Sequence, residues 1–167
     1  MNIRPEQAPD IEAVRQVNRA AFETSTEASL VDILRENARP LISLVAEDAG
    51  ALVGHIMFSP VTISSRIDAR IMGLAPMAVV PARQRHGIGS ALVTAGLDEC
   101  RRLGVAGVVV LGHATYYPRF GFRPASGFGL RSEYDVPDEV FMALELEAGG
   151  LQGAAGTVRY HPAFAMV

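Results

Sequence analysis

The chain contains no lysine and no tryptophan, and it has a single cysteine, Cys100, among 167 residues. A Walker-type phosphate loop needs a lysine that reaches the terminal phosphates, so a nucleotidase of that class is excluded. One cysteine cannot form an intramolecular disulfide or a cysteine-based metal site. The four histidines are scattered without the spacing of metal ligands, so no metal site is predicted.

Long hydrophobic runs are also missing. No apolar stretch approaches the ~18 residues of a membrane span, and the N-terminus lacks the apolar core of a signal peptide. We therefore expect a cytoplasmic protein that makes no membrane contact. With 167 residues and 49% hydrophobic composition, the chain can bury a full core, and a single domain over residues 1–167 is predicted.

Charge is distributed unevenly along the chain. The net charge is −3, but the segment from Ala82 to Ser132 holds seven arginines against two acids, so it carries +5 and the remainder −8. The basic part suits a polyanionic cofactor and the acidic part suits a cationic acceptor, although solvated surface charges are the alternative interpretation. A net acidic chain with 7% aromatic residues lacks the footprint of nucleic-acid binding, so no nucleic-acid partner is expected.

The most informative segment runs from Met77 to Leu92, with the sequence MAVVPARQRHGIGSAL. It predicts an apolar strand, a short basic turn and a helix that opens with Gly87 and Gly89. The glycines lack a Cβ, and the start of a helix offers unpaired N–H donors at a positive dipole end, a combination that binds phosphate. A dinucleotide fingerprint would need a small residue in place of Leu92 and an acid about 20 residues further on, where none stands.

The pattern Gln84-x-x-Gly87-x-Gly89 resembles the acyl-CoA signature of the GCN5-related N-acetyltransferase (GNAT) family. Tyr117, four residues before Gly121, matches the second signature of that family. The segment 111–122 is similar to a subgroup of small bacterial members with unassigned substrates, and the resemblance covers roughly residues 3–161. It implies a single-domain α/β GNAT-like fold, with a mixed and partly splayed central sheet flanked by helices.

The resemblance also implies acetyl-CoA as cosubstrate and direct transfer of its acetyl group to a primary amine. The acceptor, a small molecule or a protein N-terminus, is not identified by the sequence. A homodimer is left open, and so is a non-catalytic acyl-CoA-binding or regulatory module on the same fold. The cofactor-binding positions implied by the resemblance are Ala78, Val79, Val80, Arg85, His86, Gly87, Ile88, Gly89 and Ser90.

Tyr117 is the implied general acid. A free tyrosine has a pKa of about 10 and a thiol about 8.5, so near pH 7 Tyr117 keeps a proton for the leaving thiolate. The neighbouring Tyr116 is the alternative, and the spacing to Gly121 favours Tyr117. Because Pro118 disfavours helical backbone angles at the residue before it, a helix here is predicted to begin at Pro118.

Glu27, His55 and His113 are the candidates for the acceptor side. The resemblance implies that the helix of Glu27 borders the acceptor, and His113 stands near the position where the family usually has an asparagine. His55 shares a strand face with Met57 and titrates in a range that suits proton relay. A core histidine and a solvated helix carboxylate are the alternatives for His55 and Glu27. The strand before the glycine turn has no acid, so a water chain, or no general base, is also open.

Hydrophobic periodicity predicts the elements of the fold. A tight turn is expected at Ala49-Gly50, and Gly104 is expected to end the helix that follows the glycine turn. The Gly/Ala-rich segment Ala148–Ala155 is expected to be a mobile loop. Strands are predicted over residues 2–4, 41–48, 51–64, 71–80, 108–111, 141–147 and 156–161, and helices from Pro9, from about Thr26 and from the glycine turn to Leu103.

Overall fold

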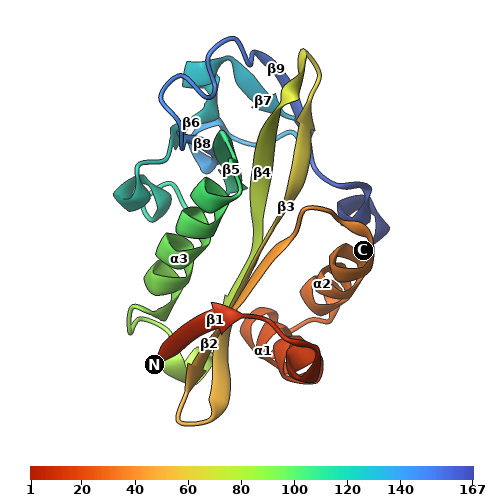
Figure 1. The fold of residues 1–167 in the computed structure, drawn as a ribbon, viewed down its shortest axis with the longest axis vertical. Helices are drawn as coiled ribbons and strands as arrows, with labels where there is room; N and C mark the ends of the chain where they lie inside the picture. The colour runs from red at the N-terminus through yellow and green to blue at the C-terminus, as the bar shows by residue number, and fades with distance from the viewer. The chain divides into compact units, whose positions relative to one another are not determined.

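The computed structural model describes residues 1–167, apart from the side chains of residues 66 and 67. The chain divides into two compact units, and strands β3 (Ala51–Ile63) and β4 (Arg66–Val79) contribute residues to both. The single domain predicted over the whole chain stays a prediction. Figure 1 labels the elements along the chain. The first unit contains Met1–Ser59, Ala75–Glu99 and Pro162–Val167, and the second contains Pro60–Leu74 and Cys100–His161.

Antiparallel strands form the sheet of the first unit. Strand β1 (Asn2–Pro5) pairs with β2 (Ile42–Asp48), and β2 pairs with β3. The predicted turn between β2 and β3 is present, because Ala49 and Gly50 both have positive φ angles, of 52° and 81°. Two successive residues with positive φ match the right-handed twist of the strands that they join.

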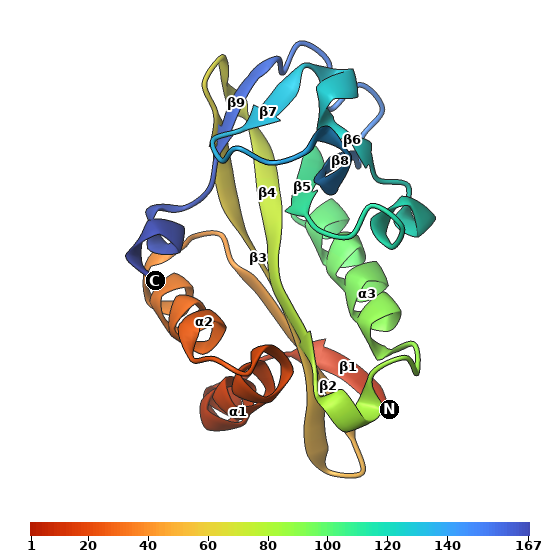
Figure 2. The same cartoon turned by 180° about the vertical axis from the view of Figure 1, so that it is seen from behind.

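Helices cover both faces of the strands in the first unit. Helices α1 (Ile11–Phe22) and α2 (Thr26–Asn37) pack on the face of β3 that carries Met57. Helix α3 (Ile88–Arg102) packs on the face that carries Gly54, because alternate residues of a strand point to opposite sides. Figures 1 and 2 show α1 and α2 on one side of β3 and α3 on the other. The core under α1 and α2 contains Val14, Leu30, Val31, Leu34, Ala38, Val45, Met57 and Ala163.

Parallel and antiparallel pairs are mixed in the second unit. Strand β4 pairs in parallel with β5 (Gly107–Leu111) over Ile71–Gly73, and it continues to Val79 beyond the last of these pairs. The pairing of β4 with β5 therefore ends at Gly73, before either strand ends, which corresponds to the predicted splay. Strand β5 pairs antiparallel with β8 (Phe141–Glu145). The short strand β6 (Arg123–Pro124) pairs with β8, and β7 (Leu130–Ser132) pairs in parallel with β9 (Gly156–Arg159), which also pairs with β3.

The segment Ala148–Ala155 is anchored at its middle. Leu151 is buried, and its backbone N–H donates to Oε2 of Glu145 at 2.9 Å. A Cβ built on Gly107 would lie 2.7 Å from Cδ2 of Leu151, so the leucine packs directly on the backbone of β5. Burial of Leu151 therefore restrains the segment at one point, and the expected mobility of the loop stays a prediction.

In the described part of the chain, no helix is long and apolar enough to cross a bilayer.

Short 3-10 helices connect many of the strands and helices. The 3-10 helices are Ala8–Asp10, Pro81–Arg83, Tyr117–Phe120, Ala125–Phe128, Asp138–Val140 and Pro162–Met166.

Candidate functional site

Hydrogen bonds fix the end of β4 and the turn that follows it. The N–H of Val80 donates to the carbonyl of Val53 at 3.0 Å, and the N–H of Arg83 donates to the carbonyl of Val80 at 2.9 Å. The side-chain amide of Gln84 donates to the carbonyl of Val79 at 3.0 Å, which draws the turn back onto the strand. The N–H of Val80 and the carbonyl of Val79, both at predicted cofactor positions, therefore have partners within the chain.

Two residues of the turn have left-handed backbone angles. Arg85 has a φ of 64° and Gly87 a φ of 83°. A Cβ built on Gly87 would meet no atom within 4 Å, so glycine is favoured there by the backbone angle and not by crowding within the chain. Arg85, His86 and Gly87 are all exposed, so the turn presents its backbone to solvent immediately before the helix.

The N-terminus of α3 follows directly. The N–H of Ala91 donates to the carbonyl of Gly87 at 3.1 Å and closes the first helical turn. The N–H groups of Ile88 and Gly89 precede this bond, so no acceptor within the helix is available to them. Helix α3 has 15 residues, and its aligned peptide dipoles place partial positive charge at this end. The exposed turn and the helix end therefore form a site that fits a phosphate or pyrophosphate group.

Two glycines allow α3 to approach β3 closely. A Cβ on Gly54 would lie 2.9 Å from Cδ1 of Leu92 and 3.1 Å from Cγ2 of Ile88. A Cβ on Gly96 would lie 2.2 Å from Cε1 of Phe58. Larger residues at either glycine would push the helix away from the strand, because the interior is close-packed. This contact holds the N-terminal end of α3 against β3. The end of β4 lies beside the same strand, because the N–H of Val80 donates to the carbonyl of Val53.

An ion pair ties the turn to the β2–β3 hairpin. The guanidinium of Arg83 lies 2.6 Å from Oδ2 of Asp48. The hydrogen bond and charge of Arg83 hold the pKa of Asp48 below its usual range. The pair is partly exposed, so we regard it as a positional restraint and not as a large source of stability.

His55 is fully buried between α1 and the strands of the first unit. Its Nδ1 lies 3.2 Å from Nδ2 of Asn18, and its Nε2 lies 2.9 Å from Oγ of Ser43. The hydroxyl of Ser43 donates its one hydrogen to Oε1 of Glu6 at 2.8 Å, because a carboxylate can only accept. Nε2 of His55 must then carry the proton that it donates to Ser43, while Nδ1 accepts from Asn18.

This network holds His55 neutral. Burial, with a smaller contribution from the charge of Arg35, lowers the pKa of His55 to about 3. Both ring nitrogens are engaged and no part of the side chain is exposed, so the ring cannot contact an acceptor in this arrangement. The geometry favours the core-histidine interpretation over the predicted role on the acceptor side.

Glu27 lies in the first turn of α2 and is partly exposed. It accepts a hydrogen bond from Oγ1 of Thr24 at 3.0 Å. A carboxylate at the start of a helix also interacts favourably with the helix dipole. These contacts describe a local structural role, and the predicted contact with an acceptor stays a prediction.

Tyr117 belongs to the second unit, where it begins the helix Tyr117–Phe120, one residue earlier than predicted. Its ring packs edge-on against Tyr116, at 5.1 Å between centroids, and against Phe122, at 5.7 Å. A Cβ on Gly112 would lie 2.3 Å from Cε2 of Tyr117, so the ring rests on the backbone there. Burial, and to a smaller extent the neighbouring Tyr116, raises the pKa of Tyr117 to about 12.

Tyr116 and His113 have different surroundings. The guanidinium of Arg119 stacks over the ring of Tyr116, 4.4 Å from its centroid. His113 has an exposed side chain, and its carbonyl accepts from the N–H of Tyr116 at 3.1 Å and of Tyr117 at 3.4 Å. Its backbone therefore supports the turn that carries Tyr117, while any contact of its side chain with an acceptor stays a prediction.

Comparison with known proteins identifies the family. Residues 11–122 match the model of the Acetyltransferase (GNAT) family. The chain belongs to the GNAT family. This GNAT chain is 44% identical over 134 residues to the uncharacterized N-acetyltransferase YjhQ of Escherichia coli (strain K12), covering 78% of this chain and 74% of that protein. It is 37% identical over 161 residues to the uncharacterized N-acetyltransferase YhbS of the same strain, covering 96% of this chain and 94% of that protein.

Solved structures of relatives support the same fold. The crystal structure of the GNAT family N-acetyltransferase YhbS from Escherichia coli, in complex with CoA, superposes with a TM-score of 0.91 at 35% identity and covers 98% of this chain and 91% of that chain. A GNAT family acetyltransferase from Brucella melitensis, in complex with acetyl-CoA, has a TM-score of 0.81 at 38% identity and covers 98% and 97%. The predicted mixed, partly splayed α/β fold of the GNAT type is confirmed.

Several residues that shape the site were not predicted from the sequence. Asp48 pairs with Arg83 of the turn, 35 residues further along the chain, and no local sequence pattern predicts such an ion pair. Gly54 offers a usable signal, because a glycine inside an apolar strand often marks a close approach of another element. The hydrogen bond of Gln84 was also not foreseen, although the residue is part of the motif.

Proposed function

We propose that this chain transfers the acetyl group of acetyl-CoA directly to a primary amine. Acetyl-CoA is the donor, because related structures hold CoA or acetyl-CoA and the exposed turn before α3 fits the pyrophosphate of that molecule. The observation that carries this proposal is the pair of left-handed residues, Arg85 and Gly87, in front of a 15-residue helix. The residues that would hold the donor are Ala78, Val79, Val80, Arg85, His86, Gly87, Ile88, Gly89 and Ser90.

Each part of this site has a separate task. The N–H groups at the start of α3 bind the pyrophosphate, and Arg85 adds a positive charge beside them. The pantetheine arm and thioester are assigned to the backbone of the strand end at Ala78–Val80, where the N–H of Val80 and the carbonyl of Val79 are already bonded within the chain. A single backbone donor at a developing oxyanion contributes about 3 kcal/mol, so plain side chains are sufficient there.

The transfer step forms one bond and breaks one. The neutral amine nitrogen attacks the thioester carbon, the C–N bond forms, and the C–S bond breaks to release the CoA thiolate. Tyr117 stays protonated at neutral pH because its pKa is raised, so its hydroxyl donates to the thiolate as the sulfur leaves. The proton lost from the attacking nitrogen passes through water to Tyr117 and replaces the proton that Tyr117 gave to the thiolate, so the step balances.

The general base is assigned to water and not to a side chain. The segment Ala75–Val79 of β4 carries no acid, and both nitrogens of His55 are engaged inside the protein. An amine that arrives neutral needs no base before attack, and a water molecule can take the proton afterwards. Glu27 is the candidate that orients the amine.

The exchange Tyr117→Phe, compared with Tyr116→Phe, tests this assignment. Loss of a positioned acid lowers kcat by ~10²-fold or more, while acetyl-CoA affinity changes little because the phenol contributes to the transition state. Tyr116→Phe serves as the matched control and should have the smaller effect. A folded Tyr117→Phe protein with the kcat of the wild type would remove Tyr117 from the mechanism.

A non-catalytic acyl-CoA-binding module is the second candidate function. The strand before the glycine turn has no acid over Ile71–Met77, and this favours the second candidate, because the family resemblance implies an acid in that strand for many catalytic members. The buried and protonated Tyr117 favours the enzyme instead. Release of CoA that depends on added amine separates the two.

A further inference from the structure

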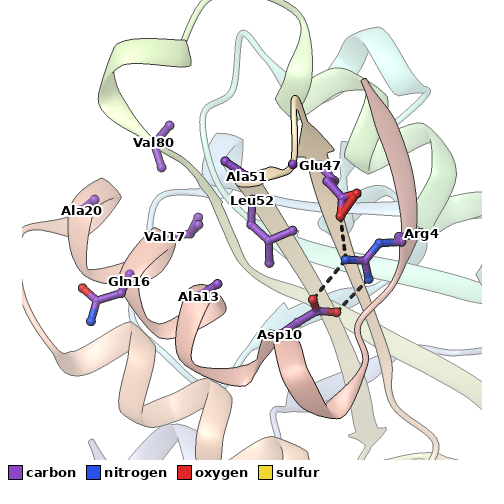
Figure 3. Close-up of a pocket in the computed structure, with 11 residues that line it drawn as sticks. Arg4, Asp10, Ala13, Gln16, Val17, Ala20, Glu47, Ala51, Leu52 and Val80 are labelled. Carbon is purple, nitrogen blue, oxygen red and sulfur yellow. Dashed lines mark hydrogen bonds and ion pairs between the residues drawn. The ribbon is translucent and has the colours of Figure 1, made fainter.

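A groove of about 600 Å³ lies in the first unit between α1 and the β2–β3 hairpin, and neither Glu27 nor His55 lines it. Figure 3 shows Ala13, Val17 and Ala20 of α1 along one side and Leu52 of β3 on the other. The α1 residues recur at the spacing that places side chains on one helix face. The walls of the groove are therefore mainly apolar, and its volume is in the range of small-molecule sites.

One end of the groove is charged. The guanidinium of Arg4 lies 2.7 and 3.0 Å from the two carboxylate oxygens of Asp10, and 3.0 Å from Oε1 of Glu47. The N–H of Gln7 also donates to Asp10, at 2.7 Å. Two carboxylates and one guanidinium leave this end with a net charge of −1.

Glu47 is the carboxylate of this end that can accept a further hydrogen bond. Among the described side chains it contacts Arg4 through Oε1 alone, so Oε2 is open to a further donor. Its side chain is 34% exposed, which allows a ligand to reach it. Asp10 is more enclosed, at 12%, and both of its oxygens already accept from Arg4.

We propose that this groove binds an amphipathic primary amine, with the ammonium group at Glu47 and the alkyl chain along Ala13, Val17 and Leu52. A carboxylate or phosphate ligand is disfavoured, because the net charge is negative and the donors of Arg4 are directed at Asp10 and Glu47. A neutral alcohol of the same shape gains the apolar contact but not the charge-assisted hydrogen bond. The site goes beyond the proposed function, because amine binding here requires no acetyl-CoA.

Calorimetric titration of the full chain with n-hexylammonium, without acetyl-CoA, tests the site. We expect measurable binding of n-hexylammonium, affinity about fivefold weaker for hexan-1-ol, and no detectable binding of hexanoate, since a partly exposed ion pair contributes up to ~1 kcal/mol. Equal affinities for n-hexylammonium and hexanoate would overturn the proposal.

Two variants assign the binding to the groove. Glu47→Gln should weaken n-hexylammonium binding about fivefold and leave hexan-1-ol unaffected. Glu36→Gln, which removes the same charge from an exposed position of α2, is the matched control and should change neither affinity. Ala13→Leu fills the groove while retaining a strong helix former, and should abolish binding of both probes. Unchanged n-hexylammonium binding in folded Glu47→Gln or Ala13→Leu protein would refute the site.

Kinetic measurements with acetyl-CoA distinguish two roles of the bound amine, as acyl acceptor or as effector. If the groove holds the acyl acceptor, Ala13→Leu raises KM for hexylamine. If it holds an effector, the variant loses calorimetric binding while KM for hexylamine is unchanged. Both results support the binding site. A chain that binds n-hexylammonium in the groove but releases no CoA with any amine would contradict the proposed transferase and leave the groove supported.

Discussion

Mild acid should destabilise this protein through His55. The folded state holds the pKa of His55 at about 3, whereas the ordinary value, which applies to the unfolded chain, is 6.5. Above pH 6.5 the ring is neutral in both states. As the pH falls below 6.5, the unfolded chain binds a proton that the folded protein does not, so the free energy of unfolding decreases until the pH approaches 3.

The size of the effect follows from the two pKa values. At pH 5 the proton taken up by the unfolded chain lowers the free energy of unfolding by about 2 kcal/mol relative to pH 8. This figure depends on the unfolded pKa and hardly on the folded one, provided that the latter lies well below 5. The carboxyls of Asp10 and Asp48 have pKa values below their usual 3.8, so their ion pairs are retained between pH 5 and 8.

Urea denaturation at pH 8, 6.5 and 5 measures this loss. His55→Gln should be less stable than the wild type at pH 8, because Asn18 and Ser43 lose their fitted partner, but its stability should change less between pH 8 and 5. His86→Gln, an exposed histidine in the turn before α3, is the control and should keep the wild-type dependence. Equal stabilities of the wild type at pH 8 and 5 would refute the neutral buried histidine.

Three further predictions concern the turn, the packing of α3 and the acceptor. Gly89→Asp should abolish acetyl-CoA binding in a titration calorimeter, because it places a negative charge where the N–H groups face pyrophosphate, while Gly89→Asn separates added bulk from added charge. Gly96→Ala should lower the free energy of unfolding by about 1–3 kcal/mol despite its better helix propensity, because the new Cβ meets the ring of Phe58; the exposed Thr94→Ala in the same helix should not destabilise. Glu27→Gln should raise KM for amines in a thiol-release assay and leave acetyl-CoA affinity unchanged, whereas a solvated carboxylate would give no kinetic effect.

Local sequence patterns predicted the main elements well. The strand β2 was expected over 41–48 and is observed at Ile42–Asp48, and the helix expected from about Thr26 begins there. Gly104 follows the end of α3 with a φ of 73°, as its position predicted. These features depend on neighbouring residues, which is why periodicity and turn residues are informative about them.

Features set by tertiary packing were missed. The strands β6 and β7 have two and three residues, too few to show a period. The helix after the glycine turn was expected to run to Leu103, but α3 ends at Arg102 and Leu103 is 40% exposed. The anchoring of Leu151 depends on its contacts with Gly107 and Glu145. The high glycine content of the segment gives no sign of these contacts.

In the candidate site too, features set by neighbouring residues were predictable and features set by distant residues were not. The conformation of the turn that we propose as the phosphate site was predictable, because Gly87 and Gly89 act within a few residues of chain. The role of His55 was not, because its partners Asn18 and Ser43 lie 37 and 12 residues away. Hydrophobic alternation placed His55 on the correct face of β3, but only the burial and the hydrogen bonds of the ring favour the core-histidine interpretation.

The central claim, transfer of an acetyl group to a primary amine, is tested most directly by thiol release. The purified chain is mixed with acetyl-CoA and a panel of primary amines that includes small polyamines, amino acids and peptides with free N-termini. We expect CoA release that rises with the concentration of at least one amine, together with that amine in N-acetylated form by mass spectrometry. Tight binding of acetyl-CoA with no amine-dependent CoA release across the panel would contradict the claim and favour the non-catalytic acyl-CoA-binding module.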